Sequence, residues 1–247
     1  MRPPLAVLSL LLLLSGSVAF AQTVLANQDV DTAKALAAFS QTPVQKVRLS
    51  GRVHAIAGST NENGTFSFDL QSTGESKLDL KLASLTRTES TDAISDDPHC
   101  TVTKADGVAK ETAVHNCWRS LDWLVPLLVL QKHASELHSA PTPSAEKSRD
   151  AASEFTVRRS NSHATGKTQA LIEKLSAVTL KLDPATSLPA SMDFNAHPEE
   201  DAGTDIPIVV RYSDYRQISG ASIPFHIQKY LNNGLVLDLQ VDDATIE

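Results

Sequence analysis

The chain has 247 residues, of which 22 are basic and 29 acidic, and 12 aromatic residues (7 Phe, 3 Tyr and 2 Trp). The formal net charge of −7 argues against a nucleic-acid phosphate backbone as a partner, and so few aromatic side chains leave few platforms for stacking bases. Two cysteines are too few for a disulfide-dense scaffold or a four-thiolate metal site. The length suffices for one large domain with a sizeable core.

The N-terminal segment, residues 1–21, has the pattern of a secretory signal peptide. A basic residue precedes an apolar run from Leu5 to Leu14, and Ala19-Phe20-Ala21 places small residues at the positions that a signal peptidase reads. A run of about ten residues is well short of the roughly 20 that span a bilayer. We therefore predict cleavage before Gln22 and an exported protein, residues 22–247, in the periplasm or the medium, with no transmembrane segment.

Because the protein is expected to be exported, Cys100 and Cys117 are expected to meet an oxidising compartment. In an oxidising compartment, two cysteines 17 positions apart most simply form one disulfide. The alternative is a zinc site, since His99 and His115 lie beside the cysteines in the sequence and zinc accepts both ligand types. Structural zinc sites usually have a different spacing, with the cysteines paired and the histidines paired. We predict the disulfide, no metal site and no other cofactor.

The first half of the expected domain is a helix followed by a meander of strands. A short amphipathic helix is predicted over 28–40 from its early acidic residues and its alanine-rich spacing. Period-two alternation and turn signals then predict strands over 47–57, 65–71 and 77–83, a hairpin turn at 61–64, a polar loop over 86–99 and a further hairpin over 101–114.

One strongly apolar segment follows, from Trp118 to Gln131. Its spacing is helical, and Pro126 is expected to kink or break the helix because its ring removes a backbone donor. The part from Trp123 to Leu130 is apolar all round, which indicates either a buried core helix or a hydrophobic lid over a cavity. We predict a helical insertion near 118–138 and a Pro-rich loop at 139–153.

The remainder of the chain returns to strands, and both halves together predict one domain over 22–247. The expected fold is mainly β (α+β): a half-open antiparallel β-barrel or strongly curved sheet with a few covering helices, because a wide sheet curls. After a segment over 154–159, the expected elements are a helix over 168–176 and strands over 178–182, 188–195, 206–215, 223–230 and 235–241.

No catalytic motif fits its sequence context. Gly166-Lys167-Thr168 resembles the end of a P-loop, but Asn161 stands where the first glycine belongs. Ser222 lies in a G-x-S-x-P segment, which lacks the second glycine of a nucleophile elbow. His133 and His138 are five apart and do not share a helix face as zinc-binding histidines do. We predict no enzyme, with a hydrolase site assembled from distant residues as the less favoured reading.

Two segments near the C-terminus carry a family resemblance. Leu180 to Pro189 resembles the "strand, D-P-x-T-x-x-P, strand" hairpin of LolA-like periplasmic proteins, and Tyr212 to Pro224 is similar to their "Y-x-D-Y-(R/K)…G…(L/I)-P" segment. The resemblance covers about a quarter of the chain, residues 180–247. It implies a half-open antiparallel β-barrel closed by helices, an apolar cavity for acyl chains, and no catalytic residues.

The resemblance and the apolar faces together predict a non-enzymatic protein that binds lipid or lipoprotein acyl chains in an apolar groove. Such a groove needs little polar recognition, because each buried CH₂ contributes about 0.8 kcal/mol. The alternative is an envelope protein-interaction or sensor module on the same fold, in which the apolar residues simply form a closed core. The candidate ligand-binding residues are Phe66, Phe68, Leu78, Leu80 and Leu82 on the strands and Leu121, Leu124 and Leu128 on the lid.

Overall fold

The computed structural model describes residues 30–134, 137–141, 153–161 and 163–247. The predicted signal peptide and residues 142–152 of the predicted Pro-rich loop lie outside the described residues. In the part that is described, no helix has the length and apolar content needed to cross a bilayer. The helices are α2 (Val30–Phe39), α3 (Val114–Cys117), α4 (Pro126–His133) and α5 (Gly166–Leu175).

Thirteen strands form one antiparallel sheet in the order β6-β5-β4-β3-β2-β1-β13-β12-β11-β10-β9-β8-β7. The strands are β1 (Lys46–Ala57), β2 (Thr60–Gln71), β3 (Ser76–Leu82), β4 (Thr86–Thr91), β5 (Cys100–Lys104), β6 (Ala109–Glu111), β7 (Leu137–Pro141), β8 (Glu154–Arg159), β9 (Val178–Leu182), β10 (Pro189–Ala196), β11 (Ile206–Ile218), β12 (Ala221–Leu231) and β13 (Gly234–Ile246).

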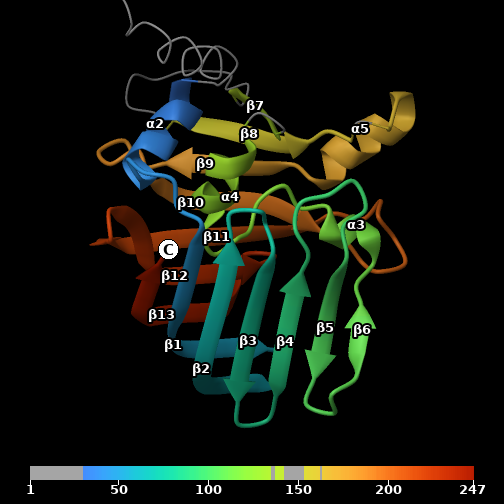
Figure 1. Cartoon of the computed structure of the whole chain (residues 1–247). Helices are drawn as coiled ribbons and strands as arrows, with labels where there is room; N and C mark the ends of the chain where they lie inside the picture. The colour runs from blue at the N-terminus through green and yellow to red at the C-terminus, as the bar shows by residue number, and fades with distance from the viewer. Residues whose placement is uncertain (1–29, 135–136, 142–152, 162) are drawn as a thin grey trace, which may run out of the picture.

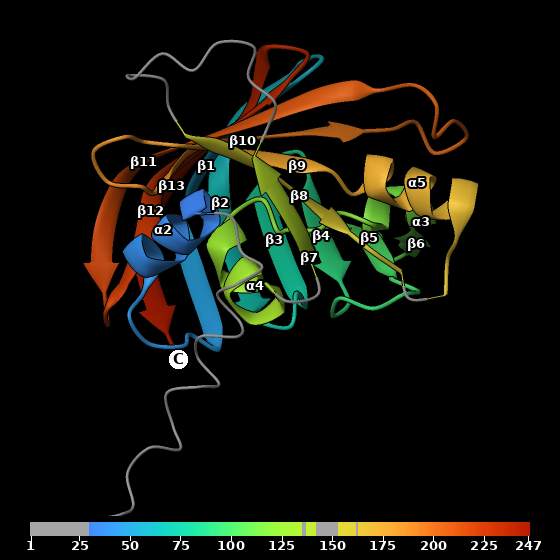
Figure 2. The same cartoon turned by 90° about the horizontal axis from the view of Figure 1, so that it is seen from above.

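The sheet consists of two meanders joined by the first and last strands. Strands β1–β6 and β7–β13 each follow chain order, and β1 pairs with β13, with Val53 opposite Leu239. Among the described residues, β6 and β7 pair on one side only, so the sheet does not close. The two meanders run at a steep angle to each other and curve around an interior (Figures 1 and 2). The predicted curved, mainly β fold is confirmed.

One hydrophobic core occupies the inner side of this curve, where α2 and α4 lie (Figure 2). Leu127 to Leu130 on α4 are each no more than 2% exposed, as expected for a helix that is covered on all sides. Each such side chain contributes about 1.5–3 kcal/mol when removed from water. The core therefore includes α4 as an inner element and not as an outer cover.

The first hairpin turns earlier than predicted. Thr60 already pairs with Ala57, so the predicted turn at 61–64 lies inside β2. Gly58 makes the turn with a φ of +59°, a left-handed conformation that glycine adopts without strain. Gly64 serves a different purpose, since a Cβ there would lie 2.1 Å from the backbone oxygen of Lys81 on the next strand.

Two other elements also differ from the prediction. The helix expected from Trp118 begins at Pro126, because proline lacks an N–H and its fixed φ suits the first helical position. Residues 86–91, predicted as loop, form β4 between β3 and β5. The alternating side chains of β4 are polar, so the strand carries no hydrophobic period. Leu137–Pro141, which spans the end of the expected insertion and the start of the expected loop, is strand β7.

Candidate functional site

The eight predicted ligand-binding side chains lie together in the interior and belong to one core cluster. In the strand ladder Phe66 stands opposite Leu80 and Phe68 opposite Leu78, whereas Leu82 stands opposite Gly64. The candidate residues of the insertion pack in the same cluster. Seven of the eight are no more than 5% exposed, and Leu82 is partly buried. We call this region the apolar end; it consists of Phe66, Phe68, Leu78, Leu80, Leu82, Leu121, Leu124 and Leu128.

Residues 118–133, which we call the insert, are held in the interior mainly by apolar packing, with polar contacts toward each end. Near its start, the hydroxyl of Tyr212 donates to the backbone oxygen of Trp123 at 2.8 Å. Near its end, Oε1 of Gln131 accepts a hydrogen bond from the backbone N–H of Val44 at 3.0 Å. The insert is thus positioned at two points, one on β11 and one in the segment that precedes β1.

The inner face of the sheet is apolar on β3 and charged on the neighbouring strand β4. Arg87 and Glu89 pair with buried leucines of β3 and continue their face, but both are charged. On β12, Lys229 comes two residues after buried Ile227 and therefore points to the same inner side. Together with Arg119 of the insert, these side chains line a cavity of about 250 Å³. We call it the charged pocket, and Arg87, Glu89, Arg119 and Lys229 are the charged side chains that we follow in it.

The charges in this pocket shift one another's ionisation. Burial works to raise the pKa of Glu89, but the positive charges of Lys229, Arg87 and Arg119 outweigh it and leave the pKa below its ordinary value. Nε of Arg87 also donates to Oε1 of Glu89 at 2.8 Å. Burial lowers the pKa of Lys229 to about 8, although Glu89 nearby favours its charged form. Three cations line the pocket, and its two carboxylates are both engaged, Glu89 by Arg87 and Glu199 by Lys110 at 2.6 Å.

Two of these cations lie against aromatic rings. Nζ of Lys229 is 4.4 Å from the ring centre of Trp123, and the guanidinium carbon of Arg119 is 5.7 Å from that of Phe194. Among the described residues, neither cation forms an ion pair. Their N–H groups are therefore not taken up by a carboxylate of the protein.

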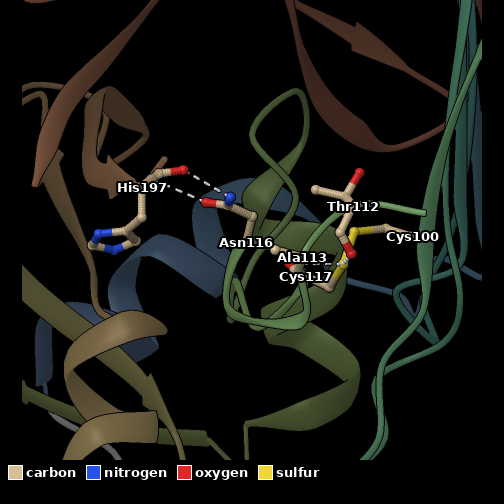
Figure 3. The surroundings of a disulfide bond; sticks show 6 residues. All are labelled: Cys100, Thr112, Ala113, Asn116, Cys117 and His197. Carbon is tan, nitrogen blue, oxygen red and sulfur yellow. Dashed lines mark hydrogen bonds between the residues drawn. A yellow bond between two sulfur atoms is a disulfide. The ribbon is translucent and has the colours of Figure 1, made fainter. Parts of the chain in front are cut away.

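The disulfide predicted between Cys100 and Cys117 is present and forms part of the pocket wall. It joins the first residue of β5 to the last of α3, with the two Cα atoms 5.7 Å apart (Figure 3). Asn116 fastens the other side of α3, since its side chain donates to the backbone oxygen of His197 at 2.8 Å and accepts from its N–H at 3.0 Å. The bonded sulfurs cannot act as the thiolate ligands that the zinc alternative requires.

The outer face of the sheet carries a serine, a histidine and an aspartate in hydrogen-bond contact, the combination expected for a hydrolase. Nδ1 of His226 is 3.1 Å from Oγ of Ser213, and Nε2 is 2.8 Å from Oδ1 of Asp238. These ring nitrogens are used in the opposite sense to a Ser-His-Asp triad, in which Nε2 faces the serine. The three residues lie on adjacent strands β11, β12 and β13, away from the interior. These contacts are typical of side chains that pair across adjacent strands, and they do not favour the hydrolase hypothesis.

No protein-family model matches the sequence, and no curated protein matches it either. Solved structures do resemble it over most of both chains. An outer membrane lipoprotein-sorting protein domain from Vibrio parahaemolyticus superposes with a TM-score of 0.51 at 10% identity, covering 88% of this chain and 91% of the other. A LolA superfamily protein from Nitrosomonas europaea gives 0.50 at 14% identity, covering 92% and 93%. The chain has a LolA-like fold.

A third structure of LolA-like fold, a DUF1329 family protein from Desulfovibrio piger, has a TM-score of 0.52 at 8% identity and covers 88% of this chain and 92% of its own. At such identities the likeness concerns the fold, and it confirms the resemblance predicted from residues 180–247. Of the four charged residues that define the pocket, Arg87, Glu89 and Arg119 lie outside residues 180–247, and Lys229 lies within them but outside both motifs.

Sequence reasoning did not single out the charged pocket. One signal was present: Lys229 continues the inward series Ile223, Phe225 and Ile227 at period two, so a charge is in phase with an apolar face. Arg119 similarly lies at the start of the apolar insert. For Arg87 and Glu89 no signal existed, because only the pairing of β4 with β3 shows which side chains face inward.

Proposed function

We propose that this protein is an exported, non-enzymatic carrier that binds the acyl part of a lipid or lipoprotein in its interior. The observation that carries the proposal is the position of α4 inside the curve of the sheet. A helix whose residues 126–130 are all apolar and buried occupies the concave side of a sheet whose fold is shared with a lipoprotein-sorting domain and a LolA superfamily protein. An acyl chain has the same surface chemistry as α4 and would replace it against the apolar end.

The energies on the two sides of such an exchange have the same order of magnitude, and the larger one favours the bound acyl chains. Removing the four buried side chains of Leu127 to Leu130 from the core costs about 6–12 kcal/mol, at 1.5–3 kcal/mol for each. Two acyl chains that bury about ten CH₂ groups each contribute about 16 kcal/mol at 0.8 kcal/mol per group. In this proposal the contacts of Tyr212 and Gln131 define where the insert returns after the ligand leaves.

The test is native mass spectrometry of the protein purified from its envelope without detergent, followed by solvent extraction. We expect a co-purifying lipid at stoichiometric occupancy. A bare mass that stays bare after incubation with phospholipid vesicles contradicts the carrier function.

A variant links this lipid uptake to the apolar end. Leu80→Trp, at a position 5% exposed, is expected to reduce lipid uptake before it reduces the thermal stability. Leu171→Trp, at an exposed position on α5, is the matched control and should leave both unchanged. If Leu80→Trp unfolds the protein with no separable loss of uptake, the apolar end is only a core.

The second candidate is an envelope protein-interaction or sensor module on the same fold. The observation that favours it is the close packing of the apolar end, where seven of eight candidate side chains are no more than 5% exposed. A module of this kind uses its interior only for stability. It predicts a bare mass in the experiment above and unchanged stability in the presence of lipid.

A further inference from the structure

The charged pocket adjoins the apolar end, and acyl binding does not account for it. We propose that this pocket binds an anionic oxygen group, a phosphate or carboxylate, through Arg119 and Lys229, and that it selects ligands with an acidic headgroup. The selection of a headgroup rests on the proposed carrier function. The anion site itself stands on the geometry of the pocket.

The first argument is that, among the described residues, two cations of the pocket have no carboxylate within ion-pairing distance. A guanidinium offers five N–H donors and an ammonium three, and both bind best to oxyanions. Within the described part of the chain Arg119 and Lys229 have aromatic rings beside them and no ion pair. Both side chains line a cavity of about 250 Å³, which is room for a headgroup but not for a whole lipid.

The second argument is that the acidic groups nearby are already engaged. Glu89 accepts from Arg87 at 2.8 Å. Asp122 accepts from the backbone N–H of Leu124 at 2.7 Å, and burial raises its pKa, which favours the neutral form. A cationic or uncharged ligand would leave Arg119 and Lys229 without a partner. An anionic ligand would satisfy both.

The third argument is the position of the pocket along the inner face. Arg87 and Glu89 are the direct strand neighbours of Leu80 and Leu78, so the pocket begins one strand away from the apolar end. Adjacent antiparallel strands lie about 4.8 Å apart. An acidic amphiphile whose chains lie on the apolar end therefore reaches the cations with its headgroup.

The experiment compares three probes by the fluorescence of Trp123, whose ring lies beneath Nζ of Lys229. The probes are a short-chain phosphatidylglycerol, the uncharged diacylglycerol with the same chains, and inorganic phosphate. We expect the wild-type protein to bind phosphatidylglycerol at least about tenfold more tightly than diacylglycerol, as charge-assisted hydrogen bonds imply.

Substitutions locate the effect. Lys229→Met and Arg119→Met should each remove most of that preference while leaving diacylglycerol binding unchanged. The matched control is Arg211→Met, because the Arg211 guanidinium lies 4.6 Å over Tyr230 on β12 but does not line the pocket. Lys229→Gln replaces Lys229→Met if the latter does not fold, with folding checked by circular dichroism.

The outcomes separate the two proposals. Equal affinity for the charged and uncharged lipids, or a preference that survives both pocket substitutions, overturns the anion site. Inorganic phosphate that binds as tightly as phosphatidylglycerol, and is lost in both variants, supports the anion site but overturns headgroup selection. Diacylglycerol that fails to bind while phosphate binds refutes the carrier function and leaves the anion site supported.

Discussion

The apolar end and the charged pocket are two stretches of the same inner face, one strand apart, and they do opposite things for the fold. The apolar end buries leucine and phenylalanine side chains and stabilises the protein. In the charged pocket, Arg119 and Lys229 lie against aromatic rings and form no direct ion pair with any described residue, and burial of the Lys229 charge costs stability. A protein that needed only a core would place apolar residues in both. Charges kept at such a cost are typical of a functional site.

The largest expected effect is on the free energy of unfolding, when a core leucine is compared with a surface leucine. Leu128→Ala at the apolar end should lower the free energy of unfolding by about 2–5 kcal/mol, because Leu128 is fully buried and the substitution leaves a cavity. Leu171→Ala on the exposed side of α5 should change it by less than about 0.5 kcal/mol. Urea unfolding measures both. Similar losses for the two variants would show that the insert is not packed in the core.

Removal of the disulfide tests whether it supports the wall of the charged pocket. Replacing Cys100 and Cys117 together by serine should cost about 3 kcal/mol, from the entropy of a loop of this length in the unfolded chain. The same variant should weaken phosphate or phosphatidylglycerol binding more than diacylglycerol binding, since α3 lines the pocket and not the apolar end. Equal weakening of all probes would contradict this separation. Thermal unfolding under non-reducing conditions is the stability measurement.

The charged pocket should also respond to pH. Because the pKa of Lys229 is about 8, its ammonium is charged at pH 7 and mostly neutral at pH 9, whereas Glu89, whose pKa is lowered, stays ionised over this range. Affinity for an anionic lipid should therefore fall by about tenfold between pH 7 and pH 9. Titration of the lipid at several pH values measures it. Lys229→Met should abolish this dependence, and a dependence that persists would place its origin elsewhere.

The smallest effect has an unusual sign. Lys229→Met should raise the free energy of unfolding at pH 7 by about 1 kcal/mol, because a Lys pKa lowered in the folded state means that its charge opposes folding. The gain is limited since Glu89 loses an attractive neighbour. In the wild type this cost disappears as the pH rises from about 8 toward the ordinary lysine value of 10.5. A loss of stability on substitution, measured by urea unfolding, would show that Lys229 is structural.

The elements with a clear hydrophobic period were predictable. Strands β1, β3 and β13 and the helix α2 lie within a few residues of their expected ranges, because alternation of apolar residues reports burial directly. The prediction was wrong where a glycine or a proline can serve either of two structural purposes. The Asn-Gly turn at 61–64 was replaced by a turn at Gly58, since Gly64 is required for close approach to Lys81. Pro126 is the first residue of α4, whereas the prediction places it inside a helix that begins at Trp118 and is kinked or broken there.

The sequence by itself determined the mainly β class, the apolar end and the disulfide, because each depends on residue type or short-range spacing. Only the tertiary structure decided that α4 lies inside the curve of the sheet and that β4 is a strand. It alone also brought Arg87, Glu89, Arg119 and Lys229 into one pocket, from segments up to 142 positions apart. The physical reason is that a charged side chain carries no periodic signal of burial, so its partners become known only when distant strands pair.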